Sequence, residues 1–290
     1  MERRDFLKTT SALGVATFAA PYILKGDQIV TQQVDQLDFM TNDNIMIIIE
    51  LAGGNDGLNT IIQADSDVYH NIRPEIGISQ QDAKQWEKFP LFMHPAMVTN
   101  LYNEGMLGLL KNGNLAVIEA VGYDEYTMSH FRGQDIWGSG KLSTDPQVKL
   151  LDGWLGRYFA TKLPNYPMVI PEHPLAINIG GYVPLAFRSK KGEFGIAINN
   201  IDKFYQQGAG LTPKDSQLSQ VGYYADEYNF VHVVAKQAEE YSKAIKVAND
   251  KGKNMVQYGG GLGDKLSMIA KLISGGLKTK VYYIQQGGYD

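Results

Sequence analysis

The feature that most constrains the fold of this chain is an apolar run from Ile45 to Leu51, which Glu50 alone interrupts. Gly53 and Gly54 follow the run. A short apolar run that ends at glycine is typical of a strand buried on both faces, as in the parallel sheets of α/β proteins. Such a strand needs cover on both sides of its sheet, and the run therefore predicts an α/β chain.

Two later segments are similar to this first strand. Residues 115–121 form an apolar run that ends at Gly122, and we expect a further strand over residues 280–285. A helical stretch around residues 95–110 precedes the second strand, which gives the strand–helix–strand order of a parallel crossover. We expect the three strands, the first at residues 45–51, to lie parallel in one sheet. The sequence thus predicts a doubly wound, mainly parallel sheet with helices on both faces.

The remaining body contains two helical patterns and one irregular stretch. Apolar residues recur three and four positions apart over residues 231–248 and again over residues 262–273, which predicts two amphipathic helices. Between residues 175 and 225 the chain is rich in Gly, Asn, Gln and Tyr. We interpret residues 175–225 as an irregular insertion or a small cap.

Composition excludes several classes of protein. The 290 residues are 44% hydrophobic, which is too high for a disordered chain, and they include no Cys. Without Cys there is no disulfide framework, thiol nucleophile, iron–sulfur cluster or Cys-ligated zinc. Lys and Arg total 27 against 31 Asp and Glu, a net charge of -4. A duplex DNA binder carries a basic excess, so we expect no nucleic acid partner.

The first residues match an export signal. Arg3 and Arg4 stand in a charged segment, and a short apolar run from Thr9 to Leu24 follows. This pattern is typical of a signal peptide, and the arginine pair indicates the twin-arginine translocation machinery as a partner. The run is shorter than the roughly 20 residues of a membrane span, so we expect no stable membrane span. The pattern also allows an amphipathic first helix with a basic start.

We therefore divide the chain into three parts. Residues 1–26 are a twin-arginine signal peptide, residues 27–43 are a polar linker, and residues 44–290 are a single α/β domain. Export by this pathway predicts a periplasmic or secreted protein. Proteins that use this pathway cross the membrane already folded. The absence of Cys agrees with this, because a chain without disulfides does not need an oxidising compartment in order to fold.

Three expected strand ends carry polar side chains. Ligands of open parallel sheets bind beyond the carboxyl ends of the strands. Asp56 follows the first strand and is either a hard oxygen ligand for a divalent cation or the cap of the next helix. Ser129 follows the second strand and is either a nucleophile or a helix N-cap. Asp290 follows the third strand and is either only a terminal acid or the second carboxylate of a metal site with Asp56.

Arg157 is the candidate anion clamp. It closes the segment from Gly153 to Arg157, where a helix is expected to begin and a guanidinium is able to hold an anion. An arginine in such a place is otherwise a partner in a surface ion pair.

Several motifs occur together in one order along the chain. They are the Arg3-Arg4 leader, Leu51–Thr60, Tyr69 with Arg73-Pro74, His94-Pro95, Ser129-His130-Phe131, Gly153–Arg157 and Gly287–Asp290. In this combination the chain resembles the bacterial family described as domain of unknown function 1501, which is similar to the alkaline phosphatase/sulfatase superfamily. The resemblance covers essentially the whole chain, and its most specific element is the Gly-Gly-Asn-Asp-Gly-Leu-Asn block.

The resemblance implies an alkaline-phosphatase-like fold and gives roles to three residues. Asp56 matches a metal-ligand Asp after the first strand, and Ser129 lies where the superfamily keeps its Ser or Thr nucleophile. Asp290 matches the Asp of a Gly-Gly-Phe/Tyr-Asp-Thr-His motif. The Thr and His of that motif do not follow Asp290 in this sequence, so we expect the chain to be incomplete at its C-terminus.

These roles imply an exported metal-dependent hydrolase of phosphate or sulfate esters. Its cofactor would be a divalent metal ion, whose carboxylate-bound charge activates the Ser129 hydroxyl and neutralises the ester oxygens. Its substrate would be a small anionic ester. The alternative is a non-catalytic exported binding or envelope protein on the same fold.

Overall fold

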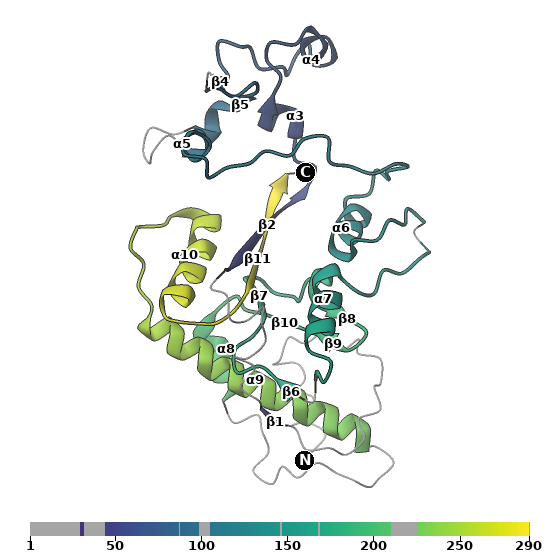
Figure 1. Ribbon diagram of the computed structural model, residues 1–290, viewed down its shortest axis with the longest axis vertical. Coiled ribbons are helices and arrows are strands. Elements are labelled where there is room, and N and C mark those ends of the chain that lie inside the picture. Colours follow the sequence, from purple (N-terminus) through teal and green to yellow (C-terminus); the bar gives the residue numbers. More distant parts are fainter. Residues whose placement is uncertain are drawn as a thin grey trace. The chain divides into compact units, whose positions relative to one another are not determined.

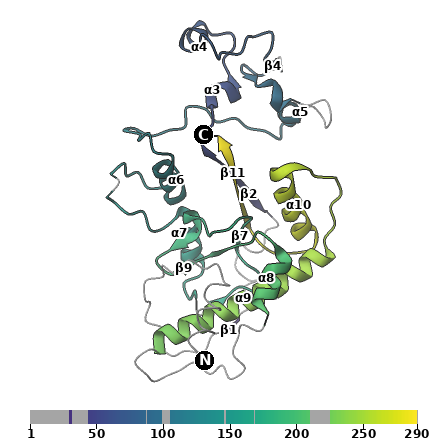
Figure 2. The ribbon, with the colours of Figure 1, turned by 180° about the vertical axis from the view of Figure 1, so that it is seen from behind.

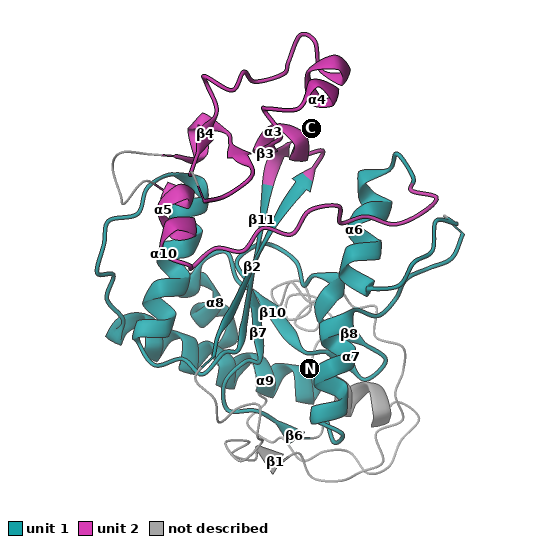
Figure 3. Ribbon diagram, turned by 45° about the horizontal axis from the view of Figure 1, so that its top comes forward, with its two compact units in different colours: residues 1–52, 127–286 teal, residues 53–126, 287–290 magenta. Residues whose placement is uncertain are grey.

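The computed structural model describes residues 30–31, 44–86, 88–98, 105–145, 147–167, 169–209 and 225–289. The expected signal peptide lies outside the described residues, as does the expected linker apart from residues 30–31. The chain divides into two compact units (Figure 3). Unit 1 comprises residues 1–52 and 127–286, and unit 2 comprises residues 53–126 and 287–290.

Unit 1 is built on a four-stranded sheet (Figure 1). The strand order is β10 (Gly195–Ala197), β7 (Ala176–Asn178), β11 (Val281–Tyr289) and β2 (Met46–Gly53). The strand β7 is parallel to both β10 and β11, with Asn178 opposite Tyr283 on β11. The strand β2 joins the edge of β11 through a bond of 2.9 Å from the Met46 N–H to the Lys280 carbonyl. The predicted parallel sheet is therefore confirmed, with the first and last predicted strands as neighbours.

The other elements of unit 1 are mostly helical. They are β1 (Val30–Thr31), α6 (His130–Ser139), α7 (Trp154–Lys162), β6 (Val169–Ile170), η2 (Leu185–Phe187), β8 (Arg188–Ser189), β9 (Gly192–Glu193), α8 (Ile201–Gly208), α9 (Ala225–Lys251) and α10 (Gly260–Ser274). The helices α9 and α10 confirm the two predicted amphipathic helices. None of the helices in the described part of the chain is long and apolar enough to cross a bilayer.

Helices pack on both sides of β11, whose successive residues point to opposite faces of the unit 1 sheet. Val281 and Tyr283 of β11 pack in one buried core with residues of α7 and η2. Tyr282 and Ile284 pack in a second core with residues of α8, α9 and α10. Figures 1 and 2 show α7 and α10 on opposite sides of β2 and β11. The predicted α/β class, with helices on both faces of the sheet, is confirmed for unit 1. The expectation that the first strand is buried on both faces is wrong, because β2 is the edge strand and its residues are exposed or only half-buried.

The second predicted strand is wrong. Residues 115–121 adopt no regular secondary structure. Ile118 and Val121 are 81% and 57% exposed, so the run packs in no sheet, and the φ of 53° at Ala120 interrupts the extended backbone near its end. The helix expected around residues 95–110 is also divided, into η1 (Pro95–Met97) and α5 (Gly105–Lys111).

The expected irregular insertion at residues 175–225 is also wrong in its described part. The strands β7 and β10 lie inside this range and form half of the unit 1 sheet. Each of them has only three residues, and Pro174, Gly180 and Asn199 stand close to their ends. Such short strands show no periodicity, and the polar residues around them are typical of loops.

Unit 2 contains an antiparallel sheet of three short strands. Its elements are α3 (Gly57–Thr60), β3 (Ile61–Ile62), α4 (Asp67–Ile72), β4 (Lys84–Gln85), β5 (Phe92–Met93), η1 and α5. The strand β5 lies between β3 and β4. Ile62, Tyr69 and Phe92 form one buried cluster beside this sheet, and Met93 packs with Leu107 of α5 in another.

Candidate functional site

The loop that follows β2 is organised around Asp56. Asp56 is the N-cap of α3, and its Oδ1 accepts a hydrogen bond of 3.1 Å from the Asn59 backbone N–H. The Thr60 hydroxyl donates to the Asp56 carbonyl at 2.7 Å, and the Asn55 side-chain amide donates to the Thr60 hydroxyl at 3.3 Å. The capping role that the sequence left open for Asp56 is therefore present. The loop also gathers carboxylate, amide and hydroxyl oxygens in one place.

Asp56 forms an ion pair with Arg73, which lies at the C-terminal end of α4. The Arg73 Nη1 donates to the Asp56 Oδ2 at 2.6 Å, and the two side chains are 18% and 40% exposed respectively. Arg73 is the C-cap residue of α4, where its N–H donates to the Tyr69 carbonyl at 3.1 Å. Both carboxylate oxygens of Asp56 thus have a partner within unit 2.

Tyr69 fixes the two segments that meet at this ion pair. Its buried hydroxyl donates to the Asn59 side-chain oxygen at 2.7 Å and accepts from the Ile78 N–H at 2.8 Å. The Asn59 side-chain amide donates in turn to the Ile76 carbonyl at 2.9 Å. The motif residues Tyr69 and Arg73 therefore hold the loop of Asp56, a role that sequence reasoning did not assign to them.

The carboxyl ends of β2 and β11 meet within unit 2. The Gly54 N–H donates to the Tyr289 carbonyl at 2.9 Å. In the sequence Asp56 stands two residues after Gly54, and Asp290 stands directly after Tyr289. Asp290 itself lies outside the described residues.

The oxygens around Asp56 suit a hard divalent cation. Among the residues that the structure describes, no group of three or more His, Cys, Asp or Glu side chains is placed to hold a metal ion. Asp56, Asn55 and Thr60 supply a carboxylate, an amide and a hydroxyl oxygen, which are donors that Mg²⁺, Ca²⁺ and Mn²⁺ prefer. The Asp56 Oδ2 already accepts a cationic partner in Arg73. These oxygens are of the type that a hard cation prefers, and Asp56 is the one carboxylate among them.

Ser129 is the N-cap of α6 in unit 1. Its exposed Oγ accepts a bond of 3.3 Å from the Arg132 backbone N–H. The cap that the sequence offered as the alternative role of Ser129 is therefore present. A hydroxyl that caps by accepting keeps its own proton, so the capping bond is compatible with a nucleophilic role.

Arg157 is engaged in an ion-pair network of unit 1. Its Nη1 donates to the Asp152 Oδ1 at 2.5 Å, and its Nη2 donates to the Ser139 carbonyl at 2.7 Å. Lys141 donates to the same Asp152 oxygen at 2.7 Å and, ahead of Arg157, holds the pKa of Asp152 below its usual range. The ion pair that the sequence allowed for Arg157 is what the structure contains. Sequence reasoning missed Asp152 as its partner.

Glu50, the polar residue inside β2, has partners on β11. The Tyr283 hydroxyl and the Gln285 side-chain amide both donate to the Glu50 Oε2, the latter at 3.4 Å. Burial and the neighbouring Glu50 raise the pKa of Tyr283 far above its ordinary value, so its hydroxyl remains a proton donor. These bonds explain why an otherwise apolar strand tolerates a carboxylate.

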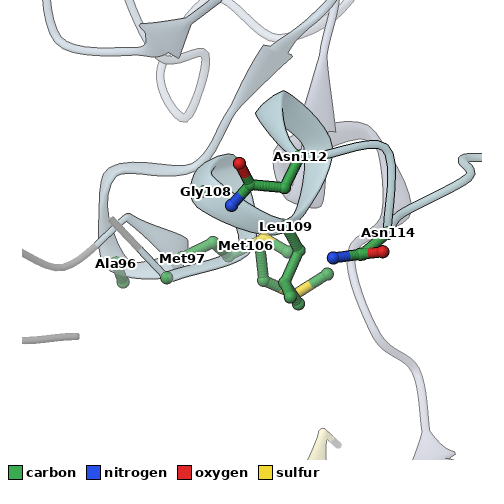
Figure 4. Close-up of a pocket in the computed structure, with 8 residues that line it drawn as sticks. Ala96, Met97, Met106, Gly108, Leu109, Asn112 and Asn114 are labelled. Atoms are coloured by element: carbon green, nitrogen blue, oxygen red, sulfur yellow. The ribbon is translucent and has the colours of Figure 1, made fainter. Parts of the chain in front are cut away.

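A hollow of about 640 Å³ lies in unit 2 (Figure 4). Its lining residues are Ala96, Met97, Gly105, Met106, Gly108, Leu109, Asn112 and Asn114. None of these side chains is titratable, so the hollow supplies neither an acid–base group nor a charge for an anionic ester. The polar loop around Asp56 is the stronger candidate site.

The structure thus brings one set of motif residues together. Within unit 2 Asp56 contacts Arg73 and Asn59, and Asn59 contacts Tyr69, whereas Ser129 belongs to unit 1. Comparison of the chain with protein-family models, with curated proteins and with solved structures gave no match.

Proposed function

We propose that the protein is a metal-dependent hydrolase of phosphate or sulfate esters with an alkaline-phosphatase-like fold, as its resemblance to domain of unknown function 1501 implies. The observation that carries this proposal is the hydrogen bond from the Gly54 N–H to the Tyr289 carbonyl. Asp56 and Asp290 follow these two residues closely in the sequence, so two carboxylates come from the ends of neighbouring parallel strands. Ligands of α/β proteins bind at this edge of the sheet.

The proposed chemistry assigns separate roles to the carboxylates and to Ser129. Asp56 and Asp290 would hold a divalent cation, which would supply positive charge to neutralise the ester oxygens. The Ser129 Oγ would attack the phosphorus or sulfur and form a new ester bond as the bond to the alcohol oxygen breaks, and the Ser129 proton would leave with the departing alcohol. Water then hydrolyses the ester formed on Ser129 and releases inorganic phosphate or sulfate.

Export is the second part of this proposal. Arg3 and Arg4 support recognition by the twin-arginine translocation machinery and a periplasmic or secreted location. Both arginines lie outside the described residues. Hydrolysis of small anionic esters outside the cytoplasm is therefore the activity that we assign to the chain.

Asp56→Asn is expected to weaken binding of Mn²⁺ or Mg²⁺ at least tenfold, which corresponds to about 1.4 kcal/mol. Asparagine retains the N-cap acceptor of α3, so the loss follows from the missing carboxylate charge and not from an uncapped helix. Isothermal titration calorimetry of the whole chain measures the affinity. Asp65→Asn is the matched control, because Asp65 is an exposed carboxylate of the same unit. Equal metal affinity of Asp56→Asn and the control would reject Asp56 as a ligand.

Ser129→Asn is expected to abolish hydrolysis of 4-nitrophenyl phosphate or sulfate, with a fall in kcat of at least 1,000-fold, on the order of 4 kcal/mol. Asparagine can cap α6 but has no hydroxyl nucleophile. Ser129→Thr keeps both the cap and the hydroxyl and is expected to retain measurable activity. Hydrolysis by Ser129→Asn at the wild-type rate would rule out the nucleophilic role.

The engaged carboxylate of Asp56 favours the second candidate function, a non-catalytic exported binding or envelope protein. One carboxylate oxygen accepts the capping hydrogen bond of α3 and the other pairs with Arg73, which is the arrangement expected of a structural residue. Wild-type protein that binds metal without hydrolysing either ester would support this function. Metal-dependent turnover that Ser129→Asn lacks would support the hydrolase.

A further inference from the structure

The Arg73 guanidinium has unused hydrogen-bond donors. A guanidinium carries five N–H groups, and within the described residues that of Arg73 makes one hydrogen bond, from Nη1 to the Asp56 Oδ2. No nitrogen of Arg73 is among the buried side-chain atoms that lack a partner, so the remaining donors reach solvent. The side chain is nevertheless only 18% exposed, and its position is therefore well defined by its surroundings.

The backbone around Arg73 is held as firmly as its side chain. The Arg73 carbonyl accepts a bond of 2.9 Å from the Gly77 N–H. A Cβ at Gly77 would lie 2.6 Å from this carbonyl oxygen, so the close approach requires glycine. Together with the bond from the Arg73 N–H to Tyr69, these contacts fix the residue on both sides. An exposed ion pair alone contributes about 0–1 kcal/mol and gives little reason for such a scaffold.

The donors of Arg157 are used quite differently. Its two terminal nitrogens donate to Asp152 and to the Ser139 carbonyl. An anion at Arg157 would have to displace a carboxylate that Lys141 also holds. Of the two arginines, Arg73 is the one with donors available to a ligand.

We infer that Arg73 binds the phosphate or sulfate group of the ester, so that it, and not Arg157, is the anion-binding residue. The inference rests on the proposed function for its choice of substrate class. The planar guanidinium is suited to donate two parallel bonds to a tetrahedral oxyanion, which an ammonium group cannot do in the same geometry. Asp56 positions the guanidinium for this contact through the bond to Nη1.

Anion binding at Arg73 is coupled to the charge of Asp56. While the Asp56 carboxylate pairs with Arg73, it cancels much of the positive charge that an anion would meet. A divalent cation bound by Asp56 offsets the negative charge of this carboxylate. Phosphate and the cation should therefore each raise the affinity of the other, and by the same factor, because such coupling is reciprocal.

The test measures binding of inorganic phosphate and inorganic sulfate to the whole chain by calorimetry at fixed ionic strength, with and without Mn²⁺. Arg73→Lys is expected to lower oxyanion affinity at least tenfold in both conditions. Arg73→Gln is the second variant in case the first is poorly folded, and circular dichroism checks both. Lys84→Gln, which removes one exposed positive charge from the same unit, should leave the affinity within twofold.

Asp56→Asn is expected to change the phosphate affinity in the opposite direction to Arg73→Lys. In metal-free protein it removes the charge that masks Arg73, so the affinity for phosphate should rise about threefold or more. The loss of a merely structural contact would not increase anion binding. Unchanged or weaker phosphate binding by Asp56→Asn would overturn the coupling to Asp56.

The outcomes separate this inference from the proposed function. If the protein binds metal through Asp56 but Arg73→Lys binds phosphate with the wild-type affinity, the inference is overturned and the proposed metal site is retained. If Arg73→Lys loses phosphate binding and the wild-type protein binds no metal, Arg73 is supported as the anion-binding residue and the metal site is rejected. The inference is also overturned if Arg157→Lys loses oxyanion affinity while Arg73→Lys does not, or if the wild-type protein binds no oxyanion.

Discussion

Gly156→Ala is expected to lower the free energy of unfolding by about 3 kcal/mol, at the upper end of the usual cost of overpacking a core. Gly156 lies in the first turn of α7, where a Cβ would overlap the backbone carbonyl group of Arg188. Gly153 at the N-cap approaches Leu185 and Ala186 as closely, and its N–H donates to the Arg188 carbonyl at 2.8 Å. The helix therefore contacts η2 and β8 through backbone atoms, which cannot yield as a flexible side chain can.

Urea unfolding followed by circular dichroism measures this change. Gly261→Ala is the matched control, because Gly261 lies in the helix α10 with no atom within 4 Å of its added Cβ. Alanine there should be neutral or stabilise by up to about 1 kcal/mol through its helix propensity. Equal stability of Gly156→Ala and the wild type would show that α7 does not pack on the backbone of Arg188.

Arg132→Ala is the second substitution with a large expected effect, a loss of about 3 kcal/mol in the free energy of unfolding. The buried guanidinium donates to the carbonyls of Ser143, Asp145 and Val148 at 2.7, 2.7 and 3.0 Å. These bonds tie the loop between α6 and α7 to the first turn of α6. Removing the guanidinium leaves three carbonyls without their charged donor.

Amide hydrogen exchange identifies where Arg132→Ala acts. Exchange should accelerate in the segment around residues 143–148 before it does so in the sheet. Arg132→Lys should recover little of the stability, since one ammonium group cannot reach three carbonyls that a planar guanidinium spans. Lys149→Ala, at an exposed position of the same loop, is the control. A loop that exchanges at the wild-type rate in Arg132→Ala would contradict this account.

Hydrophobic pattern was sufficient to predict the long elements of the sheet. The runs at residues 45–51 and 280–285 correspond to β2 and β11, and each strand begins one residue later than predicted and continues past its predicted end. The same criterion failed at residues 115–121, because an apolar run does not show whether a sheet is present to bury it, and Ile118 and Val121 are exposed. It also failed for β7 and β10, whose three residues are too few to show a strand pattern.

The candidate site was only partly predictable, for a different reason. The caps made by Asp56 and Ser129 are local, and an Asp or Ser before a helix indicates them directly. The ion pair of Asp56 with Arg73 joins residues 17 positions apart. The buried hydroxyl of Tyr69 bonds to Asn59 in the same loop, and no spacing rule for helices or strands encodes either contact.

The central claim is that Asp56 and Asp290 together hold a divalent cation. Crystals of the protein grown with Mn²⁺, measured at a wavelength that gives manganese an anomalous signal, test it most directly. We expect an anomalous peak with carboxylate oxygens of both residues within about 2.0–2.6 Å of it. A well-ordered Asp56 that still pairs with Arg73, with no peak beside it at saturating Mn²⁺, would contradict the account.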